Sequence, residues 1–407
     1  MHILLIHQAF ASLDEPGGTR HHELSRYLGS RGQRVSVIAS PISYLTGLAR
    51  EEQRTKIAAE QAGEGVTVKR VYTYPAFHRS FAHRVISFLS FMLSSFFTGL
   101  RAKQVDLIWG TSPPIFQGVT AWALARLKGV PFLFEVRDLW PAFAVAVGVL
   151  RQPTLVRVSE WLESFLYSRA DVVVVNSPGF IAHVQARGAK KVALVPNGSD
   201  TLMFDPLADG SEFRKAHGLQ DKFVVLYAGA HGMSNDLGVL LEAAQMLKPR
   251  EDILIVLLGA GKEKPSLIRQ AESLNLDNVI FLPPVAKADM CQALAAADAC
   301  IAILKPVEMY KTVYPNKVFD YMAAGRPVIL AIDGVIREVV EESGAGIAVP
   351  PGDPGALRDA IISLADDRPA GKAMGMRGRQ QVEDNFDRAV LAEKMLATMQ
   401  ALVTEED

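Results

Sequence analysis

Short apolar runs alternate with longer amphipathic stretches along most of the chain. In the first half, the spacing of apolar residues predicts helices over 19–30 and 117–127. The runs around them lack a polar face, which is typical of strands buried on both sides of a parallel sheet. These runs are ILLI (3–6), VSVIA (35–39), DLIWG (106–110), PFLFEV (131–136) and DVVVVN (171–176).

The same alternation begins again after Pro206, with helices expected over 237–247, 265–274 and 289–297. Repeated strand–helix units of this kind predict parallel sheets with right-handed crossovers. A second series therefore predicts a second doubly wound domain. Its strands are KFVVLYAG (222–229), DILIVLLGAG (252–261), NVIFLPPV (278–285), ACIAIL (299–304) and PVILAI (327–332).

The predicted fold is α/β, with one doubly wound domain over 1–205 and another over 206–385, facing each other across a cleft. The join lies in 199–213, which is rich in Asp, Gly and Pro and has little periodicity. Ligands of open parallel sheets bind beyond the carboxyl ends of the strands. Residues that directly follow a strand are therefore the candidates for a functional site.

Composition narrows the class of protein. A length of 407 residues suits two domains, and 49% hydrophobic with 21% charged residues excludes a disordered or fibrous chain. The net charge of −1 provides no global field for nucleic acid, so none is expected as a partner. Cys291 and Cys300 match no metal or redox spacing, which predicts packed thiols in a reducing, cytoplasmic compartment. The start, MHILLIHQAF, lacks the basic leader of a signal peptide and is interpreted as a buried strand.

The segment VISFLSFMLSSFFTGL (85–100) contains no charged residue. It is shorter than the roughly 20 apolar residues that a membrane span requires. Two interpretations stay open: a helix buried between the sheet and its neighbours, or a partly exposed face that rests on a membrane surface. The second interpretation draws on the basic residues that flank the segment, Arg79, Arg84, Arg101 and Lys103.

Two groups of residues follow strands of the first domain. Gly17 and Gly18 precede the helix over 19–30 and let the backbone approach a phosphate or sugar, although a loop glycine pair can also be structural. His22 lies in the first turn of that helix, where it can face the cleft or the surface. In EVRDLWP (135–141), Glu135 and Asp138 suit a hydroxyl-rich or anionic ligand, or else form a structural ion pair with Arg137 that braces the loop.

Glycine-rich turns follow two strands of the second domain. YAGAHGMSND contains Gly229, and LGAGKEK contains Gly261 and Lys262; both turns let the backbone approach a phosphate. The stretch FLPPV, which ends at Val285, offers exposed backbone groups to the edge of a nucleobase. Several such strand ends at one cleft indicate a nucleotide site more strongly than any one of them.

The most specific stretch is YPNKVFDYMAAGRPVI (314–329). Asn316 begins a helix whose first turn carries Lys317, where the helix dipole prefers an anion. Free N–H groups together with the ammonium of Lys317 predict a diphosphate site. Asp320 follows one turn later, roughly 5 Å along the axis, which suits the hydroxyls of the ribose. The alternative interpretation is a surface ion pair between Asp320 and Lys317.

These motifs resemble the retaining GT-B glycosyltransferases of family 4, and within them the bacterial branch that builds capsule and O-antigen saccharides. The resemblance implies two Rossmann-like domains, with the sugar nucleotide bound mainly by the second and the acceptor by the first. It also implies a C-terminal helix, within 386–407, that packs back on the first domain. The motifs are Gly17-Gly18, RDLWP (137–141), PNG (196–198), PNKVFDYMAAGRPVI (315–329) and GIAVPPGD (346–353).

The chain departs from the family pattern at the two acids of its Glu-x7-Glu motif. That motif would place acids at 312 and 320, where this chain has Thr312 and Asp320. The ribose role therefore carries over to Asp320, while the first acid, near the donor sugar, has no match. Glu308 is near in sequence, but its spacing is wrong.

The cations that many members place after the first strand of the second domain are also missing here. His231 is the candidate in AGAHGMSND, and Lys317, Lys305 or Lys262 would neutralise the leaving diphosphate. No D-x-D motif occurs, so neither a metal nor another cofactor is expected. Because retaining transfer in this family is described as same-face attack without an enzyme nucleophile, Glu135, Asp138 and His22 are candidates on the acceptor side.

The resulting prediction is a cytoplasmic glycosyltransferase that moves an N-acetylated aminosugar or a deoxysugar from UDP to a lipid-linked saccharide. The segment 85–100 would then contact the inner face of the plasma membrane. One alternative is a UDP-N-acetylglucosamine 2-epimerase on the same architecture, and another is a two-lobed protein that binds a small ligand. The choice of UDP over GDP, the sugar, the acceptor and the oligomeric state stay open at this point.

Overall fold

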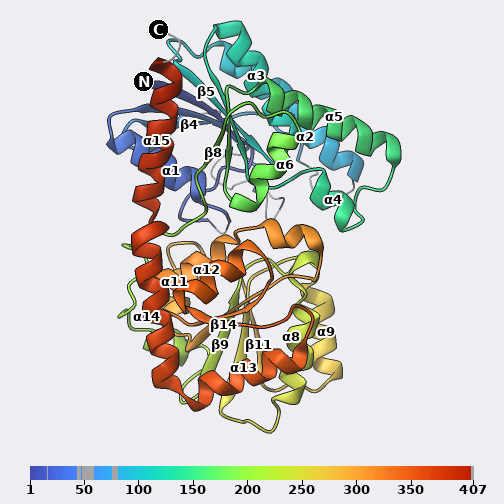
Figure 1. Cartoon of the computed structure of the whole chain (residues 1–407), viewed down its shortest axis with the longest axis vertical. Helices are drawn as coiled ribbons and strands as arrows, with labels where there is room; N and C mark the ends of the chain where they lie inside the picture. The colour runs from blue at the N-terminus through green and yellow to red at the C-terminus, as the bar shows by residue number, and fades with distance from the viewer. Residues whose placement is uncertain (16, 44–46, 48–58, 76–80, 405–407) are drawn as a thin grey trace. The chain divides into compact units, whose positions relative to one another are not determined.

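The structure is a computed structural model that describes residues 1–15, 17–43, 47, 59–75 and 81–404. It contains two compact units, each built on its own sheet (Figure 1). Unit 1 comprises the described residues of Met1–Leu13, Gly17–Pro196 and Ala389–Asp407, and unit 2 those of Asp14–Pro16 and Asn197–Arg388. The domain limits expected from the sequence, 1–205, 206–385 and 386–407, stay predictions.

Unit 1 is built on an eight-stranded sheet in the order β3-β4-β2-β1-β5-β6-β7-β8. Every neighbouring pair is parallel except β3 and β4, which form an antiparallel edge. The strands are β1 His2–Ile6, β2 Arg34–Ala39, β3 Ala59–Gly63, β4 Val66–Arg70, β5 Leu107–Ser112, β6 Phe132–Val136, β7 Val172–Val175 and β8 Val192–Leu194.

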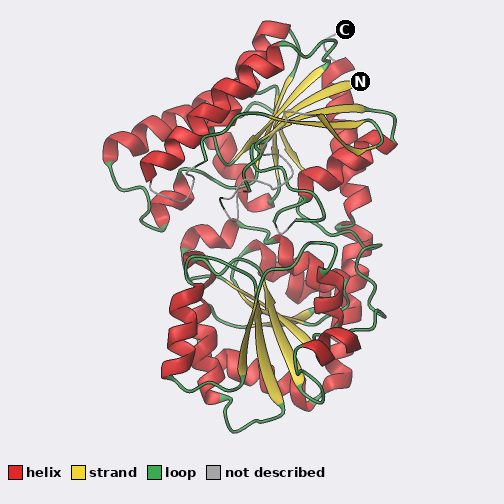
Figure 2. Cartoon of the chain, turned by 180° about the vertical axis from the view of Figure 1, so that it is seen from behind, coloured by secondary structure: helices red, strands yellow, loops and turns green. Residues whose placement is uncertain are grey.

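Helices flank the sheet of unit 1 on both faces, as Figure 2 shows. The last helix, α15, lies beside α1, and its apolar side chains share one buried cluster with β1 and β2. The helices of the unit are α1 Arg20–Ser30, α2 Phe81–Leu100, α3 Phe116–Lys128, α4 Ala142–Ala146, α5 Pro153–Arg169, α6 Ile181–Ala186 and α15 Arg388–Thr404, with a 3-10 turn at Pro178–Phe180.

Unit 2 contains a six-stranded, wholly parallel sheet in the order β11-β10-β9-β12-β13-β14. Its strands are β9 Phe223–Ala228, β10 Ile253–Leu258, β11 Val279–Leu282, β12 Ala299–Ile303, β13 Val328–Ala331 and β14 Gly346–Ala348. Its helices are α7 Ser211–Ala216, α8 Leu237–Met246, α9 Lys264–Ser273, α10 Met290–Ala295, α11 Asn316–Ala323, α12 Val335–Ser343, α13 Pro354–Asp366 and α14 Arg368–Asn385, with 3-10 turns at Met233–Asn235 and Glu308–Thr312.

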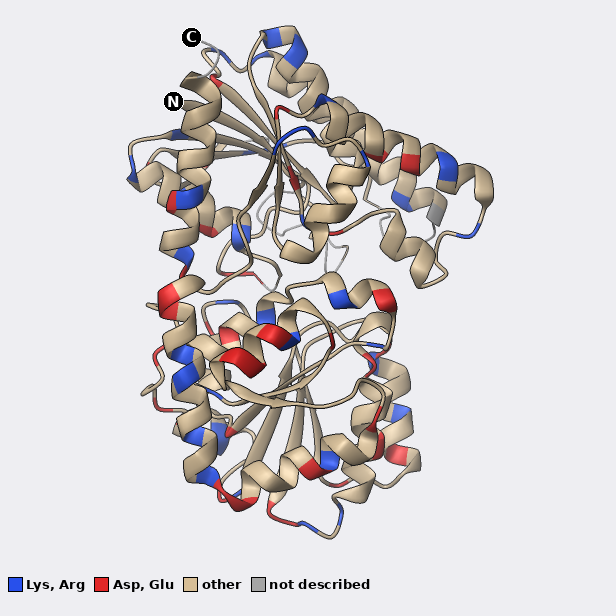
Figure 3. Ribbon diagram, viewed as in Figure 1, with Lys and Arg blue, Asp and Glu red and all other residues tan. Residues whose placement is uncertain are grey.

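The α/β class with two doubly wound sheets is confirmed. The central strands are buried throughout, as expected for apolar runs covered by helices on both faces. Cys300 is a buried free thiol and Cys291 a half-buried one. Basic and acidic residues are interspersed over both units, in agreement with the small net charge (Figure 3). None of the described helices is long and apolar enough to cross a membrane.

The packing of α15 into unit 1 yields a test. Met395 is fully buried in the cluster that α15 shares with the sheet. We expect Met395→Ala to lower the free energy of unfolding of unit 1 by about 2–5 kcal/mol, because the truncation removes buried area and leaves a cavity. Met376→Ala is the matched control, since Met376 lies half exposed on α14. Urea unfolding that gives equal losses for both variants would contradict the packing.

Candidate active site

In unit 2, the backbones of the loops after β9 and β10 lie in close contact. A Cβ atom on Gly259 would lie 1.9 Å from the carbonyl oxygen of Gly229, and one on Gly261 would lie 2.3 Å from that of His231. Both Gly229 and Gly259 have a φ of +149°, which other residues rarely adopt. The close backbones therefore require glycine at 259 and 261, whereas at 229 glycine is required by the positive φ.

Lys317 extends from the first turn of α11 to the end of β9. Its Nζ atom donates to the hydroxyl of Tyr227 at 2.9 Å and lies 4.0 Å from the centroid of that ring. A Cβ atom on Gly229 would come within 2.9 Å of this ammonium group. Burial lowers the pKa of Lys317 to about 7. The ammonium is thus poorly solvated, and an anion beside it would stabilise its charged form.

His231 is fully buried, and neither of its ring nitrogens has a hydrogen-bond partner. Burial is the main cause that lowers its pKa to about 4, and the positive charges of Lys264 and Lys317 add to the effect. Buried polar groups in folded proteins are nearly always paired, so an unpaired imidazole next to two cations needs an explanation. An anionic ligand would satisfy the ring and offset both charges.

The start of α11 offers further N–H donors next to Lys317 in the chain, because no side chain caps this helix. Lys264 is less available, since its Nζ atom donates to the carbonyl oxygens of Gly259 at 2.7 Å and Leu282 at 2.6 Å. It therefore braces the turns from which the glycines come. Lys317, His231 and the first N–H groups of α11 can together take a diphosphate.

Asp320, one turn into α11, is buried and already engaged. It accepts hydrogen bonds from the hydroxyl of Ser199 at 2.7 Å and from the ammonium of Lys287 at 2.5 Å. The side-chain nitrogen of Asn316 lies 3.4 Å from a carboxylate oxygen of Asp320. The side-chain oxygen of Asn316 accepts a hydrogen bond from Arg388. The alternative interpretation was an ion pair between Asp320 and Lys317. Asp320 is bonded to Ser199 and Lys287 instead, and Lys317 to Tyr227.

The structure places the other residues nominated for the sugar nucleotide in different surroundings. Lys262 and Lys305 are exposed, and Val285 is half buried against the core of the unit. At the position of the missing acid, the hydroxyl of Thr312 donates to the carbonyl of Met309. Glu308 is exposed and pairs with Lys311.

Three residues of this site were not nominated from the sequence: Ser199, Tyr227 and Lys287. Tyr227 belongs to a strand of buried, mostly apolar residues. Its neighbours in the sequence give no indication that its hydroxyl accepts a hydrogen bond from Lys317. Ser199 and Lys287 are far from Asp320 in sequence, so only the folded chain brings them together.

In unit 1, Glu135 at the end of β6 is the centre of a buried network. Arg20 donates to it at 2.9 Å, His21 lies 2.7 Å from its other oxygen, and the indole N–H of Trp109 donates at 3.1 Å. Arg20 also donates to the carbonyl oxygens of Val195 and Pro196. Burial alone would raise the pKa of Glu135, but His21 and Arg20 outweigh it and lower the pKa. These contacts favour the structural interpretation of Glu135.

The other acceptor-side candidates lie near this network. Burial raises the pKa of Asp138 to about 6, although the neighbouring Arg137 opposes the shift. His22 is buried, with its ring 5.8 Å from that of Phe10. Gly17 and Gly18, which were nominated for the sugar nucleotide, are exposed in the loop before α1.

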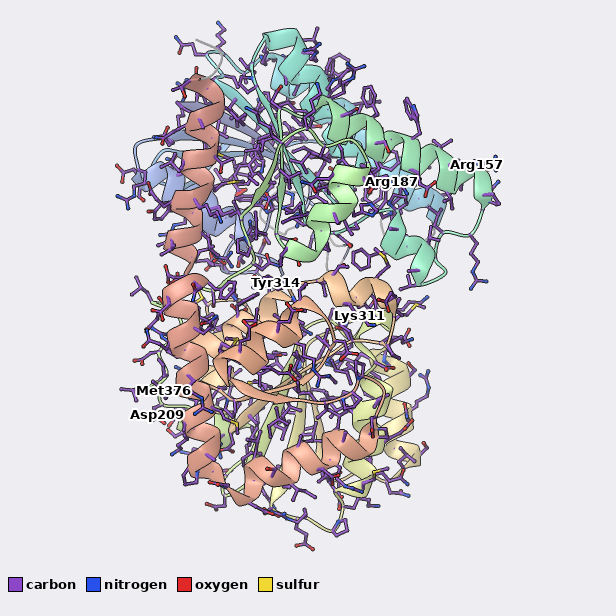
Figure 4. All side chains as sticks on the ribbon, viewed as in Figure 1. Arg157, Arg187, Asp209, Lys311, Tyr314 and Met376 are labelled. Atoms are coloured by element: carbon purple, nitrogen blue, oxygen red, sulfur yellow. The ribbon has the colours of Figure 1, made fainter. Side chains whose placement is uncertain are left out.

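A cavity of about 480 Å³ opens elsewhere on unit 2. Asp209 and Met376, labelled in Figure 4, line it together with Arg214 and Arg326. Its residues precede β12 and β13, so it lies at the amino ends of these strands and not at the glycine turns. Both arginines are already bonded, Arg214 to Asp298 and Arg326 to backbone carbonyls. We therefore do not assign the donor to this cavity.

Among the residues that the structure describes, no group of three His, Cys, Asp or Glu side chains is arranged to hold a metal ion.

Comparison with known proteins gives matches in both units. A family model described as "Glycosyl transferase 4-like domain" matches residues 17–198, and one described as "Glycosyl transferases group 1" matches residues 222–367. The probable glycosyltransferase WbjE of Pseudomonas aeruginosa is 24% identical over 81% of this chain and 84% of its own. The O-antigen chain mannosyltransferase C of Escherichia coli is 23% identical over 58% of this chain and 62% of its own.

A solved structure, that of HepE from Anabaena in complex with UDP, matches with a TM-score of 0.74 at 19% identity. The match covers 99% of this chain and 100% of that one. This likeness shows a shared fold.

The network around Glu135 yields a test of its structural role. We expect Glu135→Gln to lower the free energy of unfolding by about 3–5 kcal/mol, because it leaves the buried guanidinium of Arg20 without a counter-charge. Glu393→Gln, at an exposed carboxylate, is the control and should cost little.

The same network predicts a pH dependence. Since the folded protein lowers the pKa of Glu135, its contribution is present above the ordinary value of 4.5 and is lost as the pH falls below it. Thermal unfolding should show this acid loss in the wild type and less of it in Glu135→Gln. Equal acid profiles would contradict the assignment.

Proposed function

The chain belongs to the retaining GT-B glycosyltransferases of family 4, and on this basis we propose that it transfers a sugar from UDP to a lipid-linked saccharide. The product would serve the synthesis of a bacterial surface polysaccharide. Unit 2 binds the sugar nucleotide in this proposal, and unit 1 binds the acceptor.

One observation carries the donor assignment: the buried, unpartnered imidazole of His231 beside the poorly solvated ammonium of Lys317. A diphosphate supplies negative charge for the ammonium of Lys317 and acceptor oxygens for the N–H groups of both side chains. The glycine turns after β9 and β10 keep Cβ atoms out of the same space. Asp320 would exchange part of its present bonding for the ribose hydroxyls.

The identity of the nucleotide and of the saccharide rests on similar proteins. HepE was solved with UDP, which supports UDP over GDP. The O-antigen chain enzyme of Escherichia coli supports a role in surface polysaccharide synthesis, and its name specifies a mannosyl group. For this chain we propose an N-acetylated aminosugar or a deoxysugar, on the resemblance to the capsule and O-antigen branch.

In the reaction, the bond between C1 of the sugar and the diphosphate oxygen breaks while the acceptor oxygen bonds to C1 on the same face. The leaving diphosphate takes the hydroxyl proton of the acceptor, so the family mechanism needs no enzyme nucleophile. Protonated Lys317, His231 and the N–H groups of α11 stabilise the charge that develops on the leaving group. Asp138 and His22 orient the acceptor hydroxyl, whereas Glu135 holds α1 against β5 and β6.

The direct test is incubation with a panel of UDP- and GDP-sugars, with and without a lipid-linked saccharide. The proposal expects transfer from one UDP-sugar, only when acceptor is present, with the anomeric configuration kept. Transfer from GDP-sugars alone would overturn the choice of nucleotide. Conversion of UDP-N-acetylglucosamine to its manno epimer without acceptor would show an epimerase instead.

Single substitutions test the diphosphate site. Lys317→Ala and Asp320→Ala should each weaken UDP binding by roughly 1–3 kcal/mol, as expected for the loss of a charge-assisted hydrogen bond. Lys248→Ala, at an exposed lysine on the same unit, is the control and should leave the affinity unchanged. Calorimetry that shows wild-type affinity in both site variants would remove the assignment.

Proton uptake tests the state of Lys317. Its pKa near 7 in the free protein would rise when the diphosphate binds, because the anion stabilises the ammonium form. UDP affinity should therefore be greatest below pH 7 and fall as the pH rises above it. Above pH 7, calorimetry in buffers of different ionisation enthalpy should show net proton uptake, and Lys317→Ala should abolish it. Uptake of the same size in the variant would assign the proton to another group.

A further inference from the structure

The cavity of unit 2 has a volume suited to a small ligand and lies apart from the proposed donor site. Its volume of about 480 Å³ falls within the roughly 300–1,000 Å³ of small-molecule sites. It lies at the amino ends of β12 and β13, whereas the donor site lies beyond the carboxyl end of β9. Its walls include the segment 206–211, the end of α10, the turn 325–326 and the first half of α14.

Close backbone packing fixes these walls. A Cβ atom on Gly210 would lie 2.3 Å from the backbone nitrogen of Ala296, and one on Gly375 would lie 2.0 Å from the carbonyl oxygen of Gly325. Gly325 itself has a φ of +65°, and a Cβ atom there would lie 2.9 Å from Pro206. The segment 206–211, α10 and α14 are therefore packed on the turn and on each other without intervening side chains at these points.

Arg326 brings to this cavity a cation that has no carboxylate partner. Within the part of the chain that the structure describes, its half-buried guanidinium donates to the backbone carbonyls of Leu294 at 2.9 Å and Ala295 at 3.2 Å. Burial is the main cause that lowers the pKa of Arg326, and the neighbouring charge of Arg214 adds to the effect. An anion beside this guanidinium would stabilise its charged form.

The charges around the cavity are mostly positive. The side chains that line it carry three cations and one carboxylate. Arg214 is paired with Asp298 at 2.7 Å, whereas the exposed Lys372 has no ion pair among the described residues. Asp209 supplies the lining carboxylate, which accepts hydrogen bonds from the N–H and the hydroxyl of Ser211. The cavity therefore favours an anionic ligand.

Apolar side chains beside the cations narrow the class of ligand. Leu207 and Met376 line the cavity, and each is at least half exposed (Met376 is labelled in Figure 4). A phosphate group suits the cations, while apolar side chains can cover the C–H face of a sugar ring. We propose that this cavity binds a phosphorylated monosaccharide, which acts as an effector of the donor site.

The segment 199–211 connects the cavity to the proposed donor site. It begins at Ser199, whose hydroxyl donates to Asp320, and it ends in the cavity wall. Between these points, the ring of Phe204 lies 4.9 Å from the Nζ atom of Lys287, which is the second partner of Asp320. One continuous segment thus contacts both partners of Asp320 and the cavity.

A ligand in the cavity would hold this segment in place. In the proposed function, Asp320 exchanges part of its bonding to Ser199 and Lys287 for the ribose hydroxyls. The sugar phosphate therefore opposes UDP binding, and this regulatory role rests on the proposed function of the donor site. By linkage, UDP lowers the affinity for the sugar phosphate by the same factor.

Calorimetric titration of the full chain with glucose 6-phosphate tests the site. Inorganic phosphate and glucose, at constant ionic strength, are the comparison probes. We expect glucose 6-phosphate to bind more tightly than inorganic phosphate, and glucose alone not to bind. Saturating glucose 6-phosphate should weaken UDP binding by roughly fivefold or more, the lower end of typical coupling between two sites.

Substitutions locate the binding. Lys372→Glu should lower the affinity for glucose 6-phosphate by roughly tenfold or more, because it replaces an attractive charge with a repulsive one. Since Lys372 is exposed, the melting temperature should stay at the wild-type value. Lys248→Glu, at another exposed lysine of unit 2, is the matched control. Lys317→Ala should weaken UDP binding and leave glucose 6-phosphate binding unchanged.

Absence of glucose 6-phosphate binding by the wild type, equal loss in Lys372→Glu and Lys248→Glu, or loss in Lys317→Ala alone would overturn the site. Equal affinities for glucose 6-phosphate and inorganic phosphate would overturn the choice of a sugar ester. Binding that leaves UDP affinity unchanged would overturn the regulatory role. If the wild type does not bind UDP, the donor assignment fails, while the titration of Lys372→Glu still decides on the cavity.

Discussion

The burial of an ammonium group against the backbone at the end of β9 is the constraint on which the proposed donor site depends. Lys317 reaches this place because Gly229 has no Cβ atom there, and it is held by the hydroxyl and the ring of Tyr227. These contacts solvate the ammonium less well than water does, so burial lowers the pKa of the lysine. In our proposal, the diphosphate of the sugar nucleotide stabilises the charged form. His231 shares the same enclosure and contributes a second group without a partner.

Each unit has buried ionisable side chains at the end of a strand, but the partners of these side chains differ between the two units. In unit 1, Glu135 has a partner for each oxygen, so the cluster fixes α1 to β5 and β6 and has little bonding capacity left. In unit 2, the ammonium of Lys317 contacts the neutral side chain of Tyr227, while the carboxylate of Asp320 is bonded to Ser199 and Lys287. A buried ammonium that contacts a neutral group in place of a carboxylate favours a site for an anionic ligand over a structural ion pair.

Much of the fold could be predicted from the sequence, because uniform apolar runs such as those at 3–6 and 223–228 have one stable role in an α/β chain. The antiparallel edge formed by β3 and β4 was missed, since β3 is short and largely exposed and carries no such run. Glycine turns and the start of α11 were found because their motifs are local. The partners of Asp320 and the hydroxyl that receives Lys317 could not be found, because they are brought together only by folding. The helix at 85–100 was expected, but its orientation depends on small serine and glycine contacts that apolar periodicity does not reveal.

The central claim is that an anionic group belongs in the enclosure formed by Lys317, His231 and the first turn of α11. A crystal structure of the chain with UDP tests this most directly. The account predicts diphosphate oxygens within hydrogen-bonding distance of Lys317 Nζ and of a ring nitrogen of His231, with the ribose near Asp320. A nucleotide bound at another place, with Lys317 still on Tyr227 and His231 still enclosed without a partner, would contradict it.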